Sequence, residues 1–438
     1  MSALFGSRTM GWASLMSALV VAIVMGSAGV ASAGNSDNWR HDGMFPFSHH
    51  GAFQGHPGPV GEVQVIASGL NQPKKITVAP DGSLLVALSG DAVAPASCTD
   101  GTEQSCLDDS GAIVRVTPNG QVSTVVGDLP SVSSGGGSET SGPPSATGPV
   151  EALYQNGCLQ VLFQNTGIDP TTGQETYGPG AGLLGDLVQF HTFGGASTKV
   201  EAAFGPFEAA NNPDHGEGTA VQNGEPAIDS DPYSFVPYRG GFAVADAAGD
   251  DLLYVSPFGQ ISVLAVFPTI SETAPPGSLG PDQTTPVPVE AQPVPTAVAV
   301  GPDGALYVGE LGGDPFQAGT ESIYRVVPGQ QPRVVASGLT AVSDIAFDHF
   351  GRLLALEIDQ AGLNDPALAG SGLPTPGAII RVGWNGEQTT VASTGLEFPT
   401  GLAVGPGNVA YVSNFGVVSA TGGPDGVSGE VARVLLPR

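Results

Sequence analysis

Six copies of one strand-and-turn pattern follow one another along residues 63–438, and this repetition constrains the fold more than any other feature. Each copy has an apolar strand, a first turn with Gly, a second apolar strand, a variable loop, a third strand such as "AIVRV", and in most copies a second turn and a fourth strand. Period-two alternation broken by Gly, Pro and Asn is typical of β-hairpins. The first turns are Pro80-Asp81-Gly82, Asn156-Gly157, Gly240-Gly241, Pro302-Asp303-Gly304, Phe350-Gly351 and Gly407-Asn408.

Each copy is predicted to form a small antiparallel sheet, which cannot bury both of its faces alone. Radial stacking of six such sheets covers the faces and leaves only short edges. The sixth copy ends at "VARVLLPR" without a fourth strand, so we expect residues 63–67 to pair beside 430–436 and close the ring. The sequence therefore predicts an all-β, six-bladed β-propeller of four-stranded antiparallel blades over residues 61–438.

The segment before the repeats is predicted to be an export signal followed by a stalk. Arg8 precedes an apolar run, and Ala31-Ser32-Ala33 is a small-residue cleavage site. The run is short for a membrane anchor, so we expect residues 1–33 to be a signal peptide cleaved near Ala33, and the mature chain to be secreted without a membrane span. Residues 34–60 are predicted to be flexible, and their histidines match no defined metal site: His41, His49, His50 and His56.

Charge and cysteine content limit the partners and the compartment. The chain has 13 Lys and Arg against 41 Asp and Glu, a balance that repels nucleic acid and favours cations. We expect a monomer that binds an unidentified small molecule or protein, not nucleic acid. Cys98 and Cys106 lie in one polar loop and are predicted to form a local disulfide, whereas Cys158 opens an apolar strand and is predicted to be a buried, reduced residue.

Long stretches of the repeats resemble the secreted ScyD/ScyE family of six-bladed propellers, which is named for scytonemin-pigment gene clusters. The matching stretches include "GLNQPKKITVAPDGSLLVA", "GGFAVADAAGDDLLYVSPFGQISVLAVFP", "LYVGELGGDPFQAG" and "GLAVGPGNVAYVSNFG". The Pro-Asp-Gly turns are shared with NHL-type and gluconolactonase-like propellers. The second copy departs from the pattern at "YQNGCLQVLFQNTG". The resemblance implies the fold and export, and it carries no established reaction.

Polar residues mark the strand ends on one face of the predicted disc. Because successive strands run in opposite directions, the ends of the second strands and the starts of the first strands share that face. Alignment on the first turns places these residues at the second-strand ends: Leu88, Gln164, Asp246, Glu310, Glu357 and Asn414. The first-strand starts add residues predicted to approach the central channel: Lys75, Glu151, Asp231 and Asp344.

Three interpretations of these residues stay open at this stage. The side chains either bond loop amides at a solvated mouth, or hold a Ca²⁺-like cation, or serve an enzyme resembling gluconolactonases in which a metal polarises a carbonyl and activates water. The predicted metal ligands are Asp246, Glu310, Glu357 and Asn414, because carboxylate and amide oxygens suit calcium. The wider predicted ligand-binding set adds Asp231 and Asp344.

The sequence thus predicts an exported binding module that uses its acidic channel-mouth face, with a metal-dependent hydrolase as the alternative. Whether the protein is a catalyst is left open. The chain has no Gly-x-Ser-x-Gly turn, phosphate loop or dinucleotide fingerprint. His215 is flanked by Asp214 and Glu217 in a long loop and is the histidine that we retain as a candidate acid–base group or ligand. His191 and His349 are predicted to be structural.

Overall fold

The structure is a computed structural model of the 438-residue chain. It describes residues 60–91, 105–134, 145–164, 180–191, 197–216, 221–222, 225–226, 228–276, 283–363, 376–417 and 428–438. The predicted signal peptide, nearly all of the His-rich segment, and Cys98 lie outside these ranges. Within them, no helix is long and apolar enough to cross a membrane.

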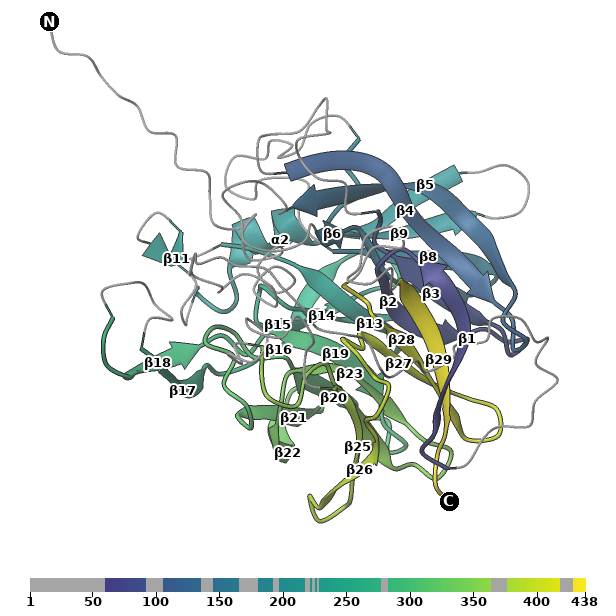
Figure 1. Ribbon diagram of the computed structural model, residues 1–438. Helices are drawn as coiled ribbons and strands as arrows, with labels where there is room; N and C mark the ends of the chain where they lie inside the picture. The colour runs from purple at the N-terminus through teal and green to yellow at the C-terminus, as the bar shows by residue number, and fades with distance from the viewer. Residues whose placement is uncertain are drawn as a thin grey trace, which may run out of the picture.

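Six four-stranded antiparallel blades surround a central axis, as the repeats predict (Figure 1). We number them blade 1 to blade 6 along the chain. The innermost strands are β2 (Pro73–Val78), β7 (Pro149–Gln155), β13 (Pro232–Tyr238), β19 (Pro295–Val300), β23 (Val342–Phe347) and β27 (Gly401–Gly405). The second strands are β3 (Leu84–Leu88), β8 (Cys158–Phe163), β14 (Gly241–Asp246), β20 (Leu306–Glu310), β24 (Leu353–Glu357) and β28 (Val409–Asn414).

The third and outer strands complete each blade in the predicted order. The third strands are β4 (Ser105–Val116), β9 (Asp186–His191), β15 (Asp251–Val255), β21 (Glu321–Val326), β25 (Ala378–Val382) and β29 (Gly429–Leu435). The outer strands are β5 (Val122–Ser134), β10 (Ser197–Ala203), β16 (Ile261–Val266), β22 (Arg333–Leu339), β26 (Gln388–Ala392) and, for blade 6, β1 (Val63–Leu70).

Most clusters of the hydrophobic core fill the spaces between neighbouring blades, and one further cluster draws residues from blades 2 to 6. Each first strand contacts the first strands of both adjacent blades, and β27 contacts β2, so the six form a ring. One apolar cluster joins Ala87 of blade 1 to Val161 of blade 2, and another joins Ile76 of blade 1 to Tyr411 of blade 6. Alternate residues of each strand serve the two flanking clusters, which is why the central strands are apolar on both faces.

The outer strand of blade 6 comes from the start of the repeats. β1 pairs antiparallel with β29, with Val63 opposite Val434 and Val65 opposite Ala432. The predicted pairing of 63–67 with 430–436 is therefore present. Ala67 and Leu70 of this strand are buried in the cluster between blades 6 and 1. We expect β1 to hold the last blade to the first because it contributes to that cluster and covers the hydrogen-bonding edge of β29.

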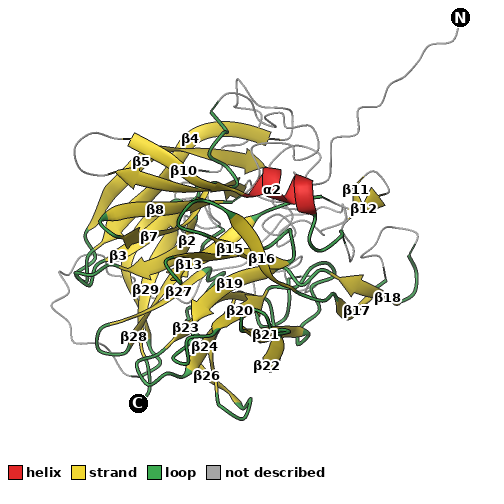
Figure 2. Cartoon of the chain, turned by 180° about the vertical axis from the view of Figure 1, so that it is seen from behind, coloured by secondary structure: helices red, strands yellow, loops and turns green. Residues whose placement is uncertain are grey.

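Additions to the blades gather on the loops between strands. β6 (Ser145–Thr147) extends blade 1, and the helix α2 (Phe204–Asn211) follows the outer strand of blade 2. Two hairpins, β11 (Val221–Gln222) with β12 (Glu225–Pro226) and β17 (Ile270–Ala274) with β18 (Val287–Ala291), lie at the periphery (Figure 2). The repeat pattern does not predict this helix, which lies between the outer strand of blade 2 and the first strand of blade 3.

Deleting residues 60–69 should lower the melting temperature by on the order of 10 °C, because it exposes the edge of β29 and removes the buried side chain of Ala67. Deleting residues 34–58 is the matched control, since that segment carries no strand pattern, and it should leave the melting curve unchanged. Thermal unfolding followed by circular dichroism measures both. Equal stability of the two truncated proteins would contradict the role assigned to β1.

Candidate functional site

Polar side chains on or just before the first strands tie every blade to the next one. In each case a hydroxyl or carboxylate contacts a backbone group of the neighbouring first strand or its leading residue. The donor and acceptor pairs are Thr77 Oγ1 to Ala152 O (2.5 Å), Phe235 N to Glu151 Oε2 (2.7 Å), Val298 N to Ser234 Oγ (3.4 Å), Thr296 Oγ1 to Val342 O (2.6 Å), Leu402 N to Asp344 Oδ2 (2.7 Å) and Thr400 Oγ1 to Pro73 O (2.7 Å). These bonds complete a circle around the axis.

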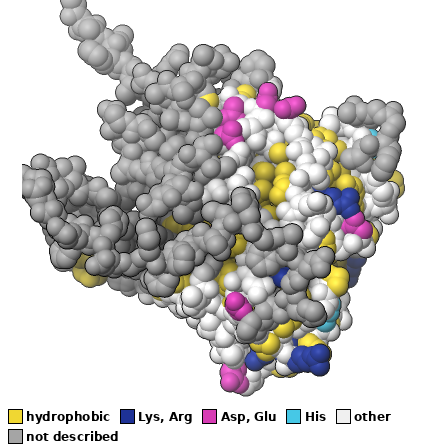
Figure 3. All heavy atoms as spheres, turned by 45° about the vertical axis from the view of Figure 1, so that its right-hand side comes forward, with side chains coloured by type: hydrophobic (Ala, Val, Ile, Leu, Met, Phe, Trp, Pro, Cys, Tyr) yellow, Lys and Arg dark blue, Asp and Glu magenta, His cyan; other side chains and the backbone are white. Residues whose placement is uncertain are grey.

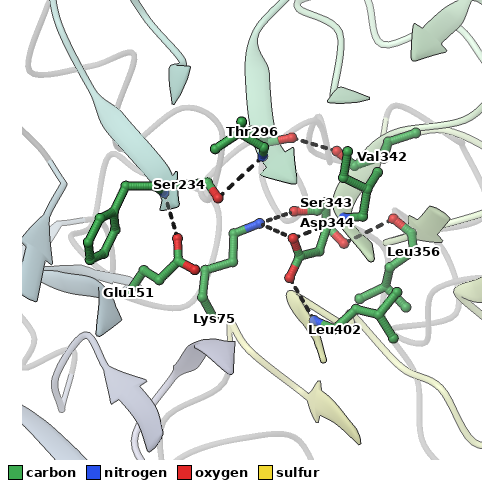
Figure 4. A network of polar contacts seen from close by, with 12 residues as sticks. Lys75, Glu151, Ser234, Thr296, Val342, Ser343, Asp344, Leu356 and Leu402 are labelled. Carbon is green, nitrogen blue, oxygen red and sulfur yellow. Dashed lines mark hydrogen bonds and ion pairs between the residues drawn. The ribbon is translucent and has the colours of Figure 1, made fainter. Parts of the chain in front are cut away.

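Lys75 crosses this circle from blade 1 to blade 5. Its Nζ lies 3.0 Å from Asp344 Oδ1 and donates to Ser343 O at 2.5 Å (Figure 4). The same Nζ lies 5.3 Å from the centre of the Tyr233 ring. Lys75 is 1% exposed. The sequence predicted that Lys75, Glu151 and Asp344 approach the channel, and the structure brings these three together.

Burial dominates the electrostatics of the channel. It raises the pKa of Glu151 to about 8, with Lys75 opposing the rise and Asp344 adding to it. Burial also raises the pKa of Asp344 against the effect of Lys75. Burial lowers the pKa of Lys74 to about 8, although Asp231 acts in the other direction. Lys75, Glu151 and Asp344 therefore form a packed polar network at the centre of the disc.

The predicted site residues at the second-strand ends each bond a backbone amide of their own blade. Asp246 Oδ1 accepts from Asp231 N (2.6 Å) and Gly249 N (3.1 Å), and its Oδ2 accepts from Ser230 Oγ. The corresponding bonds of the other three are Ser322 N to Glu310 Oε2 (3.2 Å), Thr340 N to Glu357 Oε1 (2.9 Å) and Glu397 N to Asn414 Oδ1 (2.7 Å). The bonding to loop amides was one of the three interpretations, but these side chains are buried rather than solvated.

The four predicted calcium ligands belong to four consecutive blades. Three of them carry carboxyl groups: Asp246, Glu310 and Glu357. The charges that shift the pKa of each one do not include the other two. In the part of the chain that the structure describes, no group of three or more His, Cys, Asp or Glu side chains is already arranged to hold a metal ion. The four-ligand calcium site stays a prediction, and binding there requires side chains to leave their own blades.

Sequence reasoning missed the acids that begin the third strands. Asp251 lies opposite Asp246 in the β14–β15 ladder, and Glu430 lies opposite Asn414 in the β28–β29 ladder. Glu321 begins β21 and raises the pKa of Glu310 beyond the effect of burial. Asp251 and Glu321 directly precede "LLYVS" and "SIYRV", and Glu430 is the first residue of "EVARV", so the repeats themselves contained the signal.

The predictions made for the cysteines and for His215 have different outcomes in the structure. Cys98 lies outside the described residues, so the disulfide with Cys106 stays a prediction. Cys158 is free but partly exposed, which corrects its prediction as a buried residue; its Sγ lies 3.5 Å from His191 Nδ1. The thiol is partly exposed because Cys158 directly follows the Asn156-Gly157 turn that joins β7 to β8. His215 is exposed in the left-handed region, with a φ of 60°, next to the buried Asp214.

Comparison with known proteins finds no matching family model and no matching curated protein. Among solved structures, the chain is similar to a PQQ-bound aldose sugar dehydrogenase from Streptomyces coelicolor (12% identity, 86% of this chain and 99% of that one, TM-score 0.46). It is also similar to a putative gluconolactonase (11%, 87% and 96%, 0.42) and a streptogramin B lyase (10%, 85% and 96%, 0.42). At these identities the likeness concerns the propeller fold alone.

Replacing Lys75 with Met should lower the free energy of unfolding by roughly 3–5 kcal/mol, because it leaves the buried Asp344 carboxylate without its cation. The double change Lys75→Met with Asp344→Asn should recover most of that loss, since no uncompensated charge remains and the amide oxygen still accepts from Leu402 N. Urea unfolding of both proteins measures the effect. A double variant as unstable as Lys75→Met alone would mean that the ion pair is not what Lys75 contributes.

The metal-free protein should lose stability as the pH rises from about 5 to about 9. Burial raises the pKa of Asp229 and of Glu321 to about 8, above their values in the unfolded chain. Their stabilising contribution is complete below the unfolded pKa and is lost as the pH rises through the folded pKa, by up to about 1.4 kcal/mol per group and pH unit. Urea unfolding across this range measures the slope, which Asp229→Asn should reduce. A stability that rises with pH would contradict these assignments.

Proposed function

We propose that the protein is an exported ligand-binding module that uses the acidic face formed by its second-strand ends. One observation carries this proposal. The carboxyl groups of Asp246, Glu310 and Glu357 end the second strands of three consecutive blades, are buried, and form no ion pair with Lys or Arg among the described residues. Buried acids without a counter-charge are costly to the fold, and a cationic ligand reduces that cost.

Calcium is the ligand that this chemistry favours. Glu310 Oε1 is buried without a hydrogen-bond partner, and the second strands of the two adjacent blades also end in carboxylates, those of Asp246 and Glu357. Hard cations such as Ca²⁺ take six to eight oxygen ligands, and an amide such as that of Asn414 adds a neutral one. In this proposal the bound cation, or a cationic group on a small molecule or protein, lies against the face formed by Asp231, Asp246, Glu310, Glu357 and Asn414, with Asp344 at its inner edge already paired to Lys75.

Export and family membership belong to the same proposal. The support for export is the pattern of residues 1–33, with cleavage near Ala33, and the support for the ScyD/ScyE family is the set of matching stretches in the repeats. We further propose that the mature protein is a monomer. Its acidic balance argues against nucleic acid as the partner.

The alternative function is a metal-dependent hydrolase resembling gluconolactonases. It requires a cation that polarises a carbonyl and a base that activates water. Asp214 and His215 are the observation that favours it, because an exposed imidazole lies next to a buried carboxyl group on the loop beside blade 3. This arrangement supports the base alone, whereas the binding module rests on three buried strand-end acids and is the better supported function.

Calcium should raise the melting temperature of the wild-type protein by mass action, and magnesium should raise it less because magnesium requires a tighter octahedral site. Glu310→Gln keeps the shape of the side chain and removes one charge, so it should weaken the calcium response. Differential scanning fluorimetry at a series of calcium concentrations measures both. Glu290→Gln is the control, because it removes an exposed acid of the β17–β18 hairpin and should leave the calcium response intact.

The outcomes separate the two functions. A melting curve indifferent to calcium and magnesium in both the wild type and Glu310→Gln would leave Glu310 as a structural strand end. Calcium-dependent hydrolysis of a simple lactone by the wild type, lost in His215→Ala, would favour the hydrolase. Calcium binding without hydrolysis supports the binding module.

A further inference from the structure

Six acidic side chains lie together beside α2 at one end of blade 3. Glu208 comes from α2, Asp214 from the turn that follows it, and Asp229 from the segment before β13. The others come from β14, β15 and the turn between them: Asp246, Asp250 and Asp251. All six are at most 6% exposed. No Lys or Arg is among the charges that shift their pKa values.

The pKa values show that these acids affect one another. Burial raises the pKa of Glu208 to about 9, and the charges of Asp246, Asp214 and Asp229 add to the rise. Burial raises the pKa of Asp251 well above its usual value, and Asp246, Glu208, Asp214 and Asp250 raise it further. When all six carboxyl groups are ionised, no Lys or Arg among the charges that act on them balances their negative charge.

Asp251 gives the clearest indication that this cluster binds a ligand. It is 0% exposed, and neither of its carboxylate oxygens has a hydrogen-bond partner. Asp229 Oδ2 is likewise buried without a partner. By contrast, Asp246 accepts from two backbone amides, and Asp250 Oδ1 accepts from Val294 N at 3.2 Å. An unpartnered buried carboxyl is costly, and within a cluster of acids its natural partner is a cation.

The backbone leaves space between two of the carboxyl groups. A Cβ atom on Gly249 would lie 3.3 Å from Asp246 Cγ and 3.5 Å from Glu208 Oε2, so the absence of a side chain there keeps this side of both acids open. Asn212 has a left-handed φ of 38°, and its amide, assigned with the nitrogen facing the acids, donates to Asp214 Oδ1 (2.7 Å) and Glu208 Oε1 (3.1 Å). One amide thus bridges the acid of α2 and the acid of the following turn.

We propose that Glu208, Asp214, Asp229 and Asp251 form a calcium site between α2 and blade 3, with Asp246 and Asp250 holding the surrounding backbone. The inference rests on the proposed function because the cluster includes the second-strand end of blade 3. This site differs from the ring of second-strand ends in its ligands, which come from one blade and its flanking segments. The donors are oxygens, which favours calcium over zinc or copper. The carboxyl groups do not yet converge, so binding rotates them toward Asp251.

Calorimetric titration of the full-length mature protein with CaCl₂ at about pH 7.5 tests the site. We expect calcium to bind at this cluster and protons to be released, measured as a heat that depends on the ionisation enthalpy of the buffer, because ligating carboxyl groups must be deprotonated. Asp251→Asn should weaken calcium binding at least about tenfold, since it removes a carboxylate ligand. Asp229→Asn should do the same and serves if the first variant does not fold.

Glu321→Gln is the matched control, because Glu321 is a buried acid at the same strand position in blade 4. It should leave calcium binding unchanged. Without calcium, Asp251→Asn should be at least as stable as the wild type at about pH 8, because it removes a buried uncompensated charge. A loss of calcium binding in Asp251→Asn with an unaltered calcium-free melting temperature supports the site.

Two results would overturn the inference. Calcium binding that survives Asp251→Asn and Asp229→Asn but is lost in Glu310→Gln would place the cation on the ring of second-strand ends and leave the proposed function standing. The absence of calcium binding in the wild type at concentrations up to about 10 mM, above the range of extracellular calcium modules, would remove calcium from this cluster while a different ligand of the acidic face remains testable.

Discussion

The circle of side-chain to backbone bonds between first strands is the constraint on which the rest of the structure depends. In a propeller the innermost strands are neighbours without being hydrogen-bonded partners in a sheet, so their contact has to come from side chains. Here Thr77, Glu151 and Asp344 each bond the backbone of the next blade, and equivalent residues complete the circle. Lys75 adds a link between blades 1 and 5. The apolar clusters between blades stabilise the ring, while these bonds set the spacing of its members.

The same polar residues explain why the channel is a weak candidate for a binding pocket. The Lys75 ammonium and the Asp344 carboxylate satisfy one another in the centre of the disc. The uncompensated charge lies further out, at the ends of the second strands and the starts of the third. Blade 3 concentrates it, because α2 brings Glu208 over the pair formed by Asp246 and Asp251. A protein that binds cations there gains stability that the bare carboxyl groups lack.

Most of the fold could be predicted from the sequence because a propeller is built from local hairpins. The turns such as Pro302-Asp303-Gly304 define each pair of strands within a few residues, and repetition corrects the ambiguity of any single copy. Cys158 shows the limit of this reasoning: its apolar strand is buried, but its position directly after a turn leaves the thiol partly exposed. The helix α2 was missed because its eight residues contain Gly and Pro and carry no side-chain cap.

The sequence by itself determined the number of blades, the order of the strands and the presence of acids at the strand ends, because all three follow from short-range periodicity. Only the tertiary structure decided which acids meet. Asp246 and Glu310 occupy equivalent positions in their repeats, yet Asp246 meets Glu208 and Asp251 whereas Glu310 meets Glu321. The physical reason is that blades diverge from the axis, so equivalent strand ends move apart while residues of one blade and its loops come together.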